Sequence, residues 1–264
     1  MNNEGDTTTA NTTNRFQGKV AFVTGAGSGI GRATAQAFAA EGARVAVVDL
    51  PGDGLDETAQ LIQGAGGTAL AITADVTDPH DVKAAVRQTV DTLGGLDVAF
   101  NNAGIEQEQT FTADLSIEDF DRIIATDLRG VFLCMQQQIP VMVAAGGGSI
   151  VNTSSGAGVI GIAGQAAYAA AKHGLAGLTK SAALEYVDKG VRINSVAPGV
   201  IDTAMMGRVT GGTDEGRDTM VSQEPIGRMG RPEEIASAVL WLSSEGGGFT
   251  VGHTLVVDGG QTLG

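Results

Sequence analysis

The chain has 264 residues, of which 42% are hydrophobic and 17% are charged, and its formal net charge is −14 at pH 7. These values favour a folded globule over a disordered chain, and one α/β domain accounts for the length. The negative charge repels phosphate backbones and anionic lipid, so we expect no nucleic acid partner and no membrane partner. No apolar run approaches the ~20 residues that a membrane-spanning helix needs.

The N-terminal residues 1–14, MNNEGDTTTANTTN, are polar and have neither the basic nor the apolar region of a signal peptide. We predict a disordered tail over 1–14 and a single domain over 15–264. Cys134 is the one cysteine of the sequence, so an internal disulfide is excluded and a cytoplasmic location is expected. It lies in the apolar run GVFLCM, which predicts a buried, inert thiol. We predict no metal site.

Short β-branched apolar runs alternate with Ala-rich amphipathic stretches along the rest of the chain. The predicted strands are residues 19–25, 44–50, 69–76, 96–104, 148–155, 191–199 and 254–260. The predicted helices are residues 30–41, 54–64, 79–93, 117–144, 165–188 and 232–243. This alternation is typical of a parallel, doubly wound sheet with helices on both faces. The expected fold is therefore a single Rossmann-type α/β domain with a parallel sheet of about seven strands.

One segment, residues 201–227, interrupts the alternation. It is rich in Gly, Thr and charged residues and contains no clear strand. A long irregular insertion in a compact domain is often a lid over a site, although a disordered surface loop is the alternative. Met205 and Met206 favour the lid, because flexible apolar side chains suit a substrate cover.

The first predicted strand runs directly into TGAGSGIG, residues 24–31, which opens a predicted helix. The glycines Gly25, Gly29 and Gly31 would let the backbone approach a pyrophosphate. The free N–H groups at the start of the helix would favour its negative charge. A glycine motif between a strand and a helix near the start of a chain predicts a dinucleotide site.

The second predicted strand places an acidic residue, Asp49, near its end. Its carboxylate can hydrogen-bond the adenosine ribose hydroxyls of a dinucleotide and would repel a 2′-phosphate. No Arg or Lys follows it in the sequence DLPGDG. NAD is therefore favoured over NADP, and the alternative is that Asp49 is only a turn residue at the strand end.

The stretch AAYAAAKHG, residues 166–174, is predicted to be helical and carries Tyr168 and Lys172 four positions apart. Residues at this spacing share one helix face, so their head groups can approach each other. A phenol titrates near pH 10 in water, and a neighbouring cation favours its phenolate form. The pair therefore predicts a proton-transfer device; the alternative is a packed tyrosine with a solvated lysine.

The segments TGAGSGIG, NNAG (101–104), YAAAK and APGVIDT (197–203) stand in the order and spacing of one family. The chain resembles the short-chain dehydrogenase/reductase family over essentially its whole length after the tail. The resemblance implies that Tyr168 is the general acid/base and that Lys172 binds the nicotinamide ribose and favours the phenolate. It also implies that Ser155 orients the substrate oxygen. The reaction implied is hydride transfer between a carbinol carbon and C4 of the nicotinamide.

The resemblance assigns further residues to the cofactor site. Asp75 and Val76 would flank the adenine, and Thr203 would reach the nicotinamide carboxamide, a role compatible with capping a helix at the lid start. Besides Tyr168 and Lys172, the implied set is Gly25, Ser28, Gly29, Ile30, Gly31, Asp49, Asp75, Val76, Asn101, Asn102, Ala103, Gly104, Pro198, Gly199, Val200 and Thr203.

One position departs from the family pattern. Family members usually carry Asn in a segment like xNLxG, where it helps to hold a water of the proton relay, and this chain has Asp127 there. A carboxylate lacks the donor of an amide. Asp127 could still hold the water, could raise the pKa of Lys172 through its negative charge, or could weaken turnover. We hypothesise a working relay whose pH dependence is shifted.

The expected substrate cleft has mostly apolar walls. They are formed by Ile105, Glu106, Gly156, Val159, Ile160, Gln165, Met205 and Met206. With no Arg or Lys among them, they favour a neutral secondary alcohol or ketone, such as a cyclic diol or a sugar, over a strongly anionic substrate. Glu106, Gln165, Met205 and Met206 are the substrate candidates, although Glu106 could equally be a solvated loop residue.

The C-terminal segment HTLVVDGGQTLG resembles the last strand of the family, which commonly packs at a dyad in tetramers. Together with the long predicted helices 117–144 and 165–188, it favours a homotetramer or a homodimer.

Two other functions stay open. One is a non-enzymatic NAD(H)-binding redox sensor, in which Asp127 marks lost catalysis; against it, Ser155, Tyr168 and Lys172 are all present. The other is an NADPH-dependent ketoacyl-type reductase. That activity needs a basic residue near position 28 or after 49, where this chain has Ser28 and Leu50.

Overall fold

A computed structural model describes residues 14–222 and 224–263, so the predicted tail lies outside the described residues except for residue 14. All seven predicted strands form one sheet. They are β1 (Val20–Thr24), β2 (Arg44–Asp49), β3 (Thr68–Thr73), β4 (Val98–Asn101), β5 (Gly148–Thr153), β6 (Val191–Pro198) and β7 (Thr254–Val257). Their order is β3-β2-β1-β4-β5-β6-β7, and every neighbouring pair is parallel. The predicted fold class is confirmed.

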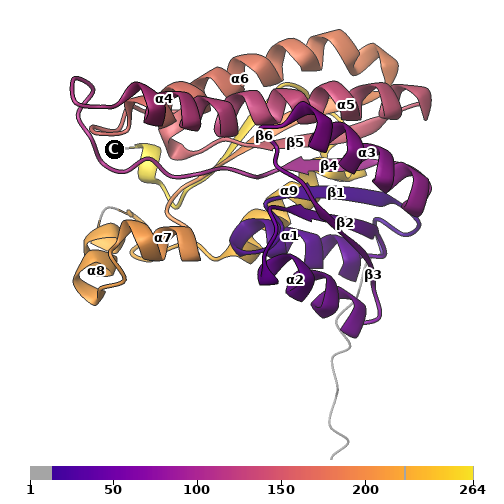
Figure 1. The fold of residues 1–264 in the computed structure, drawn as a ribbon, viewed down its shortest axis with the longest axis horizontal. Coiled ribbons are helices and arrows are strands. Elements are labelled where there is room, and N and C mark those ends of the chain that lie inside the picture. Colours follow the sequence, from indigo (N-terminus) through magenta and orange to yellow (C-terminus); the bar gives the residue numbers. More distant parts are fainter. Residues whose placement is uncertain (1–13, 223, 264) are drawn as a thin grey trace, which may run out of the picture.

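Helices cover both faces of the sheet (Figure 1). One face carries α3 (Pro79–Leu93), α5 (Val131–Ala144) and α6 (Ala166–Tyr186), and the other carries α1 (Gly29–Ala40), α2 (Asp53–Gly64) and α9 (Pro232–Ser243). In β1, Val20 and Phe22 pack toward the first layer, while Ala21 and Val23 pack toward the second. A strand buried on both faces is apolar at successive positions, which explains the sequence VAFVT.

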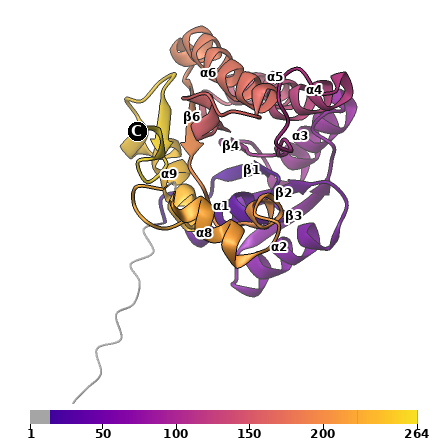
Figure 2. The same cartoon turned by 90° about the vertical axis from the view of Figure 1, so that its left-hand side faces the viewer.

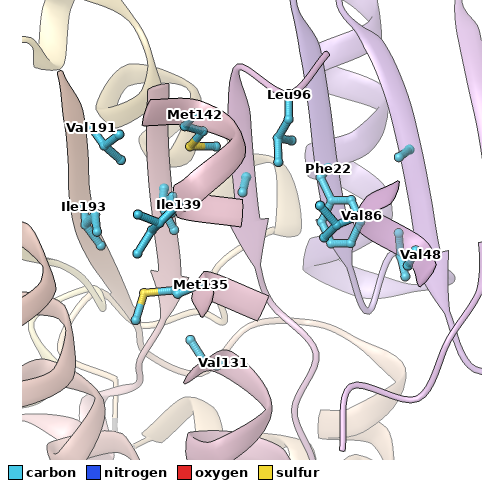
Figure 3. Close-up of a cluster of buried hydrophobic side chains, with 14 of the residues drawn as sticks. Phe22, Val48, Val86, Leu96, Val131, Met135, Ile139, Met142, Val191 and Ile193 are labelled. Atoms are coloured by element: carbon cyan, nitrogen blue, oxygen red, sulfur yellow. The ribbon is translucent and has the colours of Figure 1, made fainter. Parts of the chain in front are cut away.

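The layer of α3, α5 and α6 encloses a core of branched and sulfur-containing side chains (Figure 3). Met135, Ile139 and Met142 project from α5 toward Ile193 of β6 and its neighbours. Cys134, on the same helix, is 2% exposed, and burial raises the pKa of its thiol to about 12. The expectation of a buried, unreactive thiol agrees with this environment.

The predicted single helix over 117–144 is divided. It comprises α4 (Ile117–Ile124), a π-helical turn (Ala125–Gly130) and α5. A π turn inserts one residue into the helical repeat and often lies at a functional site. Asp127 lies within this turn and is fully buried, so the π turn contains the position at which the sequence departs from the pattern of the family that it resembles.

The predicted lid segment is more regular than the sequence indicates. It contains two short helices, α7 (Ala204–Val209) and α8 (Asp214–Ser222). Figure 1 shows them outside the two helical layers, and Figure 2 shows them in front of one end of the sheet. The interpretation as a disordered loop is wrong for the described part of this segment. None of the helices in the described residues is long and apolar enough to cross a membrane.

The strand order reverses between β1 and β4, because the chain crosses from one edge of the sheet back to its middle. In open parallel sheets, ligands bind at the carboxyl ends of the strands at such a switch point. Here those ends carry the glycine motif after β1 and the segment NNAG after β4. The fold therefore places the two motifs at one expected binding edge.

Candidate active site

The glycine motif forms a tight turn between β1 and α1. Gly25 has φ +62°, and a Cβ on Gly31 would lie 2.0 Å from the Gly25 carbonyl oxygen. The Asn102 side-chain amide donates to the carbonyls of Thr24 and Gly25, which ties the end of β4 to this turn. Ser28 makes no capping bond with its side chain at the start of α1, which suits an anion ligand at the helix N-terminus.

The Asp49 carboxylate lies against the glycine turn. Its two oxygens accept hydrogen bonds from the backbone N–H groups of Gly27 and Leu50, each at 2.7 Å. The neighbouring guanidinium of Arg32 donates to the Gly27 carbonyl and to Glu57, both at 2.6 Å. A phosphate group placed here would meet a carboxylate on one side and an already paired Arg on the other.

The other residues assigned to the cofactor site occupy different environments. Asp75 follows β3, and its carboxylate accepts from the Thr77 N–H and hydroxyl at 2.8 Å each. Ile30 packs against the core, whereas Val76 packs in a small cluster beside Ala103. Pro198 ends β6, and Gly199 and Val200 follow it toward the lid.

The Asn101 side chain lies in a buried amide network at the end of β4. It is 1% exposed, and its amide exchanges hydrogen bonds with Gln138 of α5 and donates to Asn152 of β5. The next residue, Asn102, follows the strand and has different partners, since its amide donates to the carbonyls of Thr24 and Gly25. That Asn101 lines the cofactor stays a prediction.

Lys172 is the centre of the candidate catalytic group. Its ammonium is 2.9 Å from Asp127 Oδ1, donates to the Thr153 carbonyl at 3.0 Å and lies 5.3 Å from the centroid of the Tyr168 ring. The Lys172 and Asp127 residues are 2% and 0% exposed. The Asp127 carboxylate also accepts from the Ile105 N–H at 3.3 and 3.2 Å. The structure therefore brings three predicted catalytic residues together.

Charge and burial compete at this pair. Burial lowers the pKa of Lys172, but the Asp127 carboxylate and Tyr168 outweigh it and raise the pKa above its ordinary value. Burial raises the pKa of Asp127, and the Lys172 ammonium opposes that change. Of the three effects left open for Asp127, a raised Lys172 pKa is the one that agrees with this geometry. The lysine therefore retains its proton beside the phenol.

The two serines after β5 have different environments. Ser154 is 1% exposed, and its hydroxyl donates to the Lys172 carbonyl, so it anchors α6. Ser155 is half-buried, and its hydroxyl accepts only a weak bond from the Ala157 N–H at 3.2 Å. Ser155, the residue that the family spacing selects, is thus the one whose hydroxyl is available to a ligand.

Sequence reasoning missed Gln107. Its side chain is buried, accepts from the Tyr168 N–H and donates to the Gly164 carbonyl, each at 3.0 Å. It therefore fixes the first turn of α6, which begins one residue after Gln165, to the segment after β4. An isolated Gln in a loop carries no local signal of such a contact.

The lid begins beside the glycine turn. The Thr203 hydroxyl accepts from the Met206 N–H and caps α7, and a Cβ on Gly29 would lie 3.1 Å from Thr203 Cγ2. Farther along α7, Arg208 forms two hydrogen bonds with the Glu106 carboxylate, at 2.6 and 3.1 Å. The positions expected to form the cleft walls include no Arg, but Arg208 of the lid pairs with one of them, Glu106.

Two cavities of the described part of the chain lie at the lid. Met206 lines the first, of about 180 Å³, together with Asp202 and Arg217. The second, of about 160 Å³, lies between the end of the lid and β7 and includes Glu224. Met206 thus packs between the lid helices, while Met205 is a half-buried neighbour on α7. Their predicted contact with substrate stays a prediction.

Comparisons with known proteins agree with this arrangement. The family model described as enoyl-(acyl carrier protein) reductase matches residues 25–262. Cyclohexanol dehydrogenase of Acinetobacter sp. (strain SE19) is 48% identical, with 94% of this chain and 97% of that protein covered. Cis-4-hydroxycyclohexanecarboxylate dehydrogenase of Sinomonas cyclohexanicum is 44% identical over 94% of this chain and 98% of that protein.

A solved structure is also similar. The crystal structure of levodione reductase superposes with a TM-score of 0.91 and 38% sequence identity, covering 94% of this chain and 99% of that chain. The chain belongs to the short-chain dehydrogenase/reductase family of oxidoreductases, and the dehydrogenases named above act on CH–OH groups.

Proposed function

We propose that the protein is an NAD(H)-dependent oxidoreductase that transfers a hydride between the nicotinamide and a neutral cyclic secondary alcohol or its ketone. The observation that carries the proposal is the buried Lys172 ammonium, held by Asp127 and the Thr153 carbonyl 5.3 Å from the Tyr168 ring. A fixed cation beside a phenol favours transfer of a proton at the phenolic oxygen.

Each residue of the candidate catalytic group has a separate role in the proposed reaction. In the oxidation direction, Tyr168 accepts the hydroxyl proton of the alcohol while Ser155 donates a hydrogen bond to its oxygen. Lys172 stabilises the phenolate, and the Thr153 carbonyl and Asp127 fix the ammonium in place. The nicotinamide, when bound, supplies the hydride acceptor. The tight Gly25–Gly31 approach and the open start of α1 fit a dinucleotide pyrophosphate.

The substrate class draws support from the relatives. One is named for cyclohexanol and another for cis-4-hydroxycyclohexanecarboxylate, so a six-membered ring with a secondary hydroxyl is the first substrate to test. The test is absorbance of reduced nicotinamide with NAD and a panel of cyclohexanol, cyclic diols and sugars. Turnover with the ring alcohols supports the proposal. Tight NADH binding without turnover of any alcohol would instead support the redox sensor.

The Asp49 carboxylate supports NAD over NADP. We expect wild type to bind NADH at least about tenfold more tightly than NADPH, because a 2′-phosphate would approach a carboxylate. In Asp49→Asn the preference for NADH over NADPH should be smaller, since the amide removes the negative charge and its oxygen can still accept a hydrogen bond from the Gly27 N–H. Calorimetric titration with NADH and with NADPH measures the two affinities. Asp53→Asn, in the first turn of α2, is the matched charge control and should leave the ratio unchanged. An unchanged ratio in Asp49→Asn would contradict this role.

The Asp127 charge should displace the pH dependence of turnover. Asp127→Asn removes the carboxylate that raises the pKa of Lys172, so the ammonium beside the Tyr168 ring releases its proton at lower pH. Because proton transfer at Tyr168 depends on that cation, the kcat/KM profile for alcohol oxidation should move toward lower pH, by about one unit. Asp121→Asn, an exposed change of equal charge on α4, is the control. A profile that superimposes on wild type would contradict this account.

We also propose a cytoplasmic homotetramer or homodimer. The two regions expected to form contacts between subunits are the long helices and the C-terminal segment. Large apolar side chains are exposed on both: Phe132 on α5 and Leu184 on α6, and Phe249 and Leu263 near the C-terminus. Surface patches of this kind support symmetric association. Light scattering of the purified protein measures the mass, and a monomer at micromolar concentration would contradict the proposal.

A further inference from the structure

We infer that Glu106 determines the charge preference of the substrate cleft by holding Arg208 in an ion pair with two hydrogen bonds. Because Arg208 is occupied, the cleft selects uncharged cyclic alcohols over ring alcohols that carry a carboxylate. This inference rests on the proposed function and names the substrate class of that same site. It assigns a specificity-determining role to a pair that joins the loop after β4 to the lid.

The position of Glu106 follows from its neighbours. A Cβ on Gly104 would lie 2.6 Å from Asp127 Oδ1 and 3.5 Å from Lys172 Nζ, so this segment adjoins the catalytic pair. The next residue, Ile105, donates its N–H to Asp127. Glu106 therefore lies one residue beyond the backbone that contacts the catalytic group.

Arg208 approaches Glu106 from the lid. It lies on α7, whose capping residue Thr203 adjoins Gly29 of the glycine turn. Met205 precedes Arg208 by three positions, a spacing that places both on one side of a helix. The Glu106–Arg208 pair thus joins the loop after β4, which adjoins the catalytic pair, to the lid, which begins beside the glycine turn.

The guanidinium of Arg208 binds both carboxylate oxygens of Glu106. Arg208 Nε and Nη2 donate to Oε1 and Oε2 of Glu106, at 2.6 and 3.1 Å. The hydrogen bonds from Arg208 lower the pKa of Glu106, so its carboxylate stays ionised and the pair stays closed at neutral pH. The planar fork of Arg that matches one carboxylate would match a substrate carboxylate equally well.

Neighbouring cations are also paired with carboxylates. Lys172 is bound to Asp127. Arg122, whose charge lowers the pKa of Glu106, donates a hydrogen bond to Asp119. Arg217 of the lid is bound through both terminal nitrogens to Asp202. With a net charge of −14 on the chain, an anionic substrate meets a repulsive field and no unpaired partner among these groups. Loss of the Glu106 charge would release Arg208 for such a substrate.

The experiment measures binding and turnover separately. Binding of cyclohexanecarboxylate to the NADH-loaded protein is followed by calorimetry in wild type, Glu106→Gln, and Glu106→Gln with Arg208→Gln. We expect Glu106→Gln to bind the carboxylate at least about tenfold more tightly than wild type, and the double variant to lose that gain. Turnover of cis-4-hydroxycyclohexanecarboxylate relative to cyclohexanol should rise in parallel.

The controls separate this inference from the proposed function. Asp202→Asn releases Arg217, another exposed guanidinium of the lid, and should not increase carboxylate binding. Both pairs are exposed, and such pairs contribute little to stability, so the variants should remain folded. Absence of turnover of every ring alcohol in the panel by wild type would overturn the proposed function, whereas the binding comparison stands without turnover. Equal carboxylate binding by wild type and Glu106→Gln, or a gain that persists in the double variant, would overturn the inference.

Discussion

Lys172→Met is expected to abolish turnover and to lower the free energy of unfolding by about 3–5 kcal/mol. The replacement leaves Asp127 as a fully buried carboxylate whose remaining partner is the Ile105 N–H. An unpaired buried charge is among the most destabilising changes a single substitution makes, because the ion loses both its hydration and its counter-ion. Urea unfolding followed by circular dichroism measures the stability, and reduced-nicotinamide absorbance measures the turnover.

The matched control is Lys172→Met combined with Asp127→Asn. With the carboxylate replaced by an amide, most of the lost stability should return, whereas turnover should stay absent because no cation faces Tyr168. Recovery of stability without activity would separate the structural role of the pair from its chemical role. A single Lys172→Met variant as stable as wild type would show that Asp127 does not carry a buried charge.

Gly31→Ala is expected to weaken NADH binding by at least about tenfold and to destabilise the fold by about 1–3 kcal/mol. The new Cβ would lie 2.0 Å from the Gly25 carbonyl oxygen and 2.8 Å from the Asn102 amide nitrogen. Either the turn or α1 must move, and both would form the pyrophosphate site. Quenching of protein fluorescence by NADH measures the binding, and thermal unfolding measures the stability.

Gly64→Ala is the control for that substitution. Gly64 ends α2, and nothing lies within 4 Å of a Cβ built there, so the added methyl group should leave NADH binding unchanged. If Gly31→Ala bound NADH as tightly as wild type, the close approach of α1 to the glycine turn would not be needed for the cofactor.

The sheet was predictable because its central strands are buried on both faces. Runs such as VAFVT and RVAVVD carry apolar side chains at nearly every position, and glycine-rich turns separate them from the helices. The glycine motif and the spacing of Tyr168 and Lys172 are local patterns, so the sequence revealed them as well. The fold class and the family were therefore predicted correctly.

The π turn at Ala125–Gly130 was not predictable from periodicity. The apolar pattern continues from α4 into α5, so the sequence reads as one helix, and a single inserted residue hardly changes it. The same limit applies to Asn101 and Asn102, because the NNAG motif does not show that β4 ends at Asn101 or that the two side chains have different partners.

Contacts between distant segments account for the remaining differences. Gln107 fixes the start of α6, and Arg208 reaches Glu106 across about a hundred positions of sequence, with neither pair marked by any local motif. The ion pair of Asp127 with Lys172 is similar, because the substitution was visible but its direct contact was not. Such pairings depend on the packing of whole elements, which residue patterns alone do not specify.

The proton-transfer role of Tyr168 is the central claim, and the initial rate of NAD reduction with cyclohexanol in wild type and Tyr168→Phe tests it most directly. The ring and its contact with Lys172 remain in the variant, so NADH binding should be unchanged. We predict that the rate falls by about a thousandfold, within the range that a positioned acid/base contributes. A Tyr168→Phe variant that oxidises cyclohexanol at the wild-type rate would contradict the account.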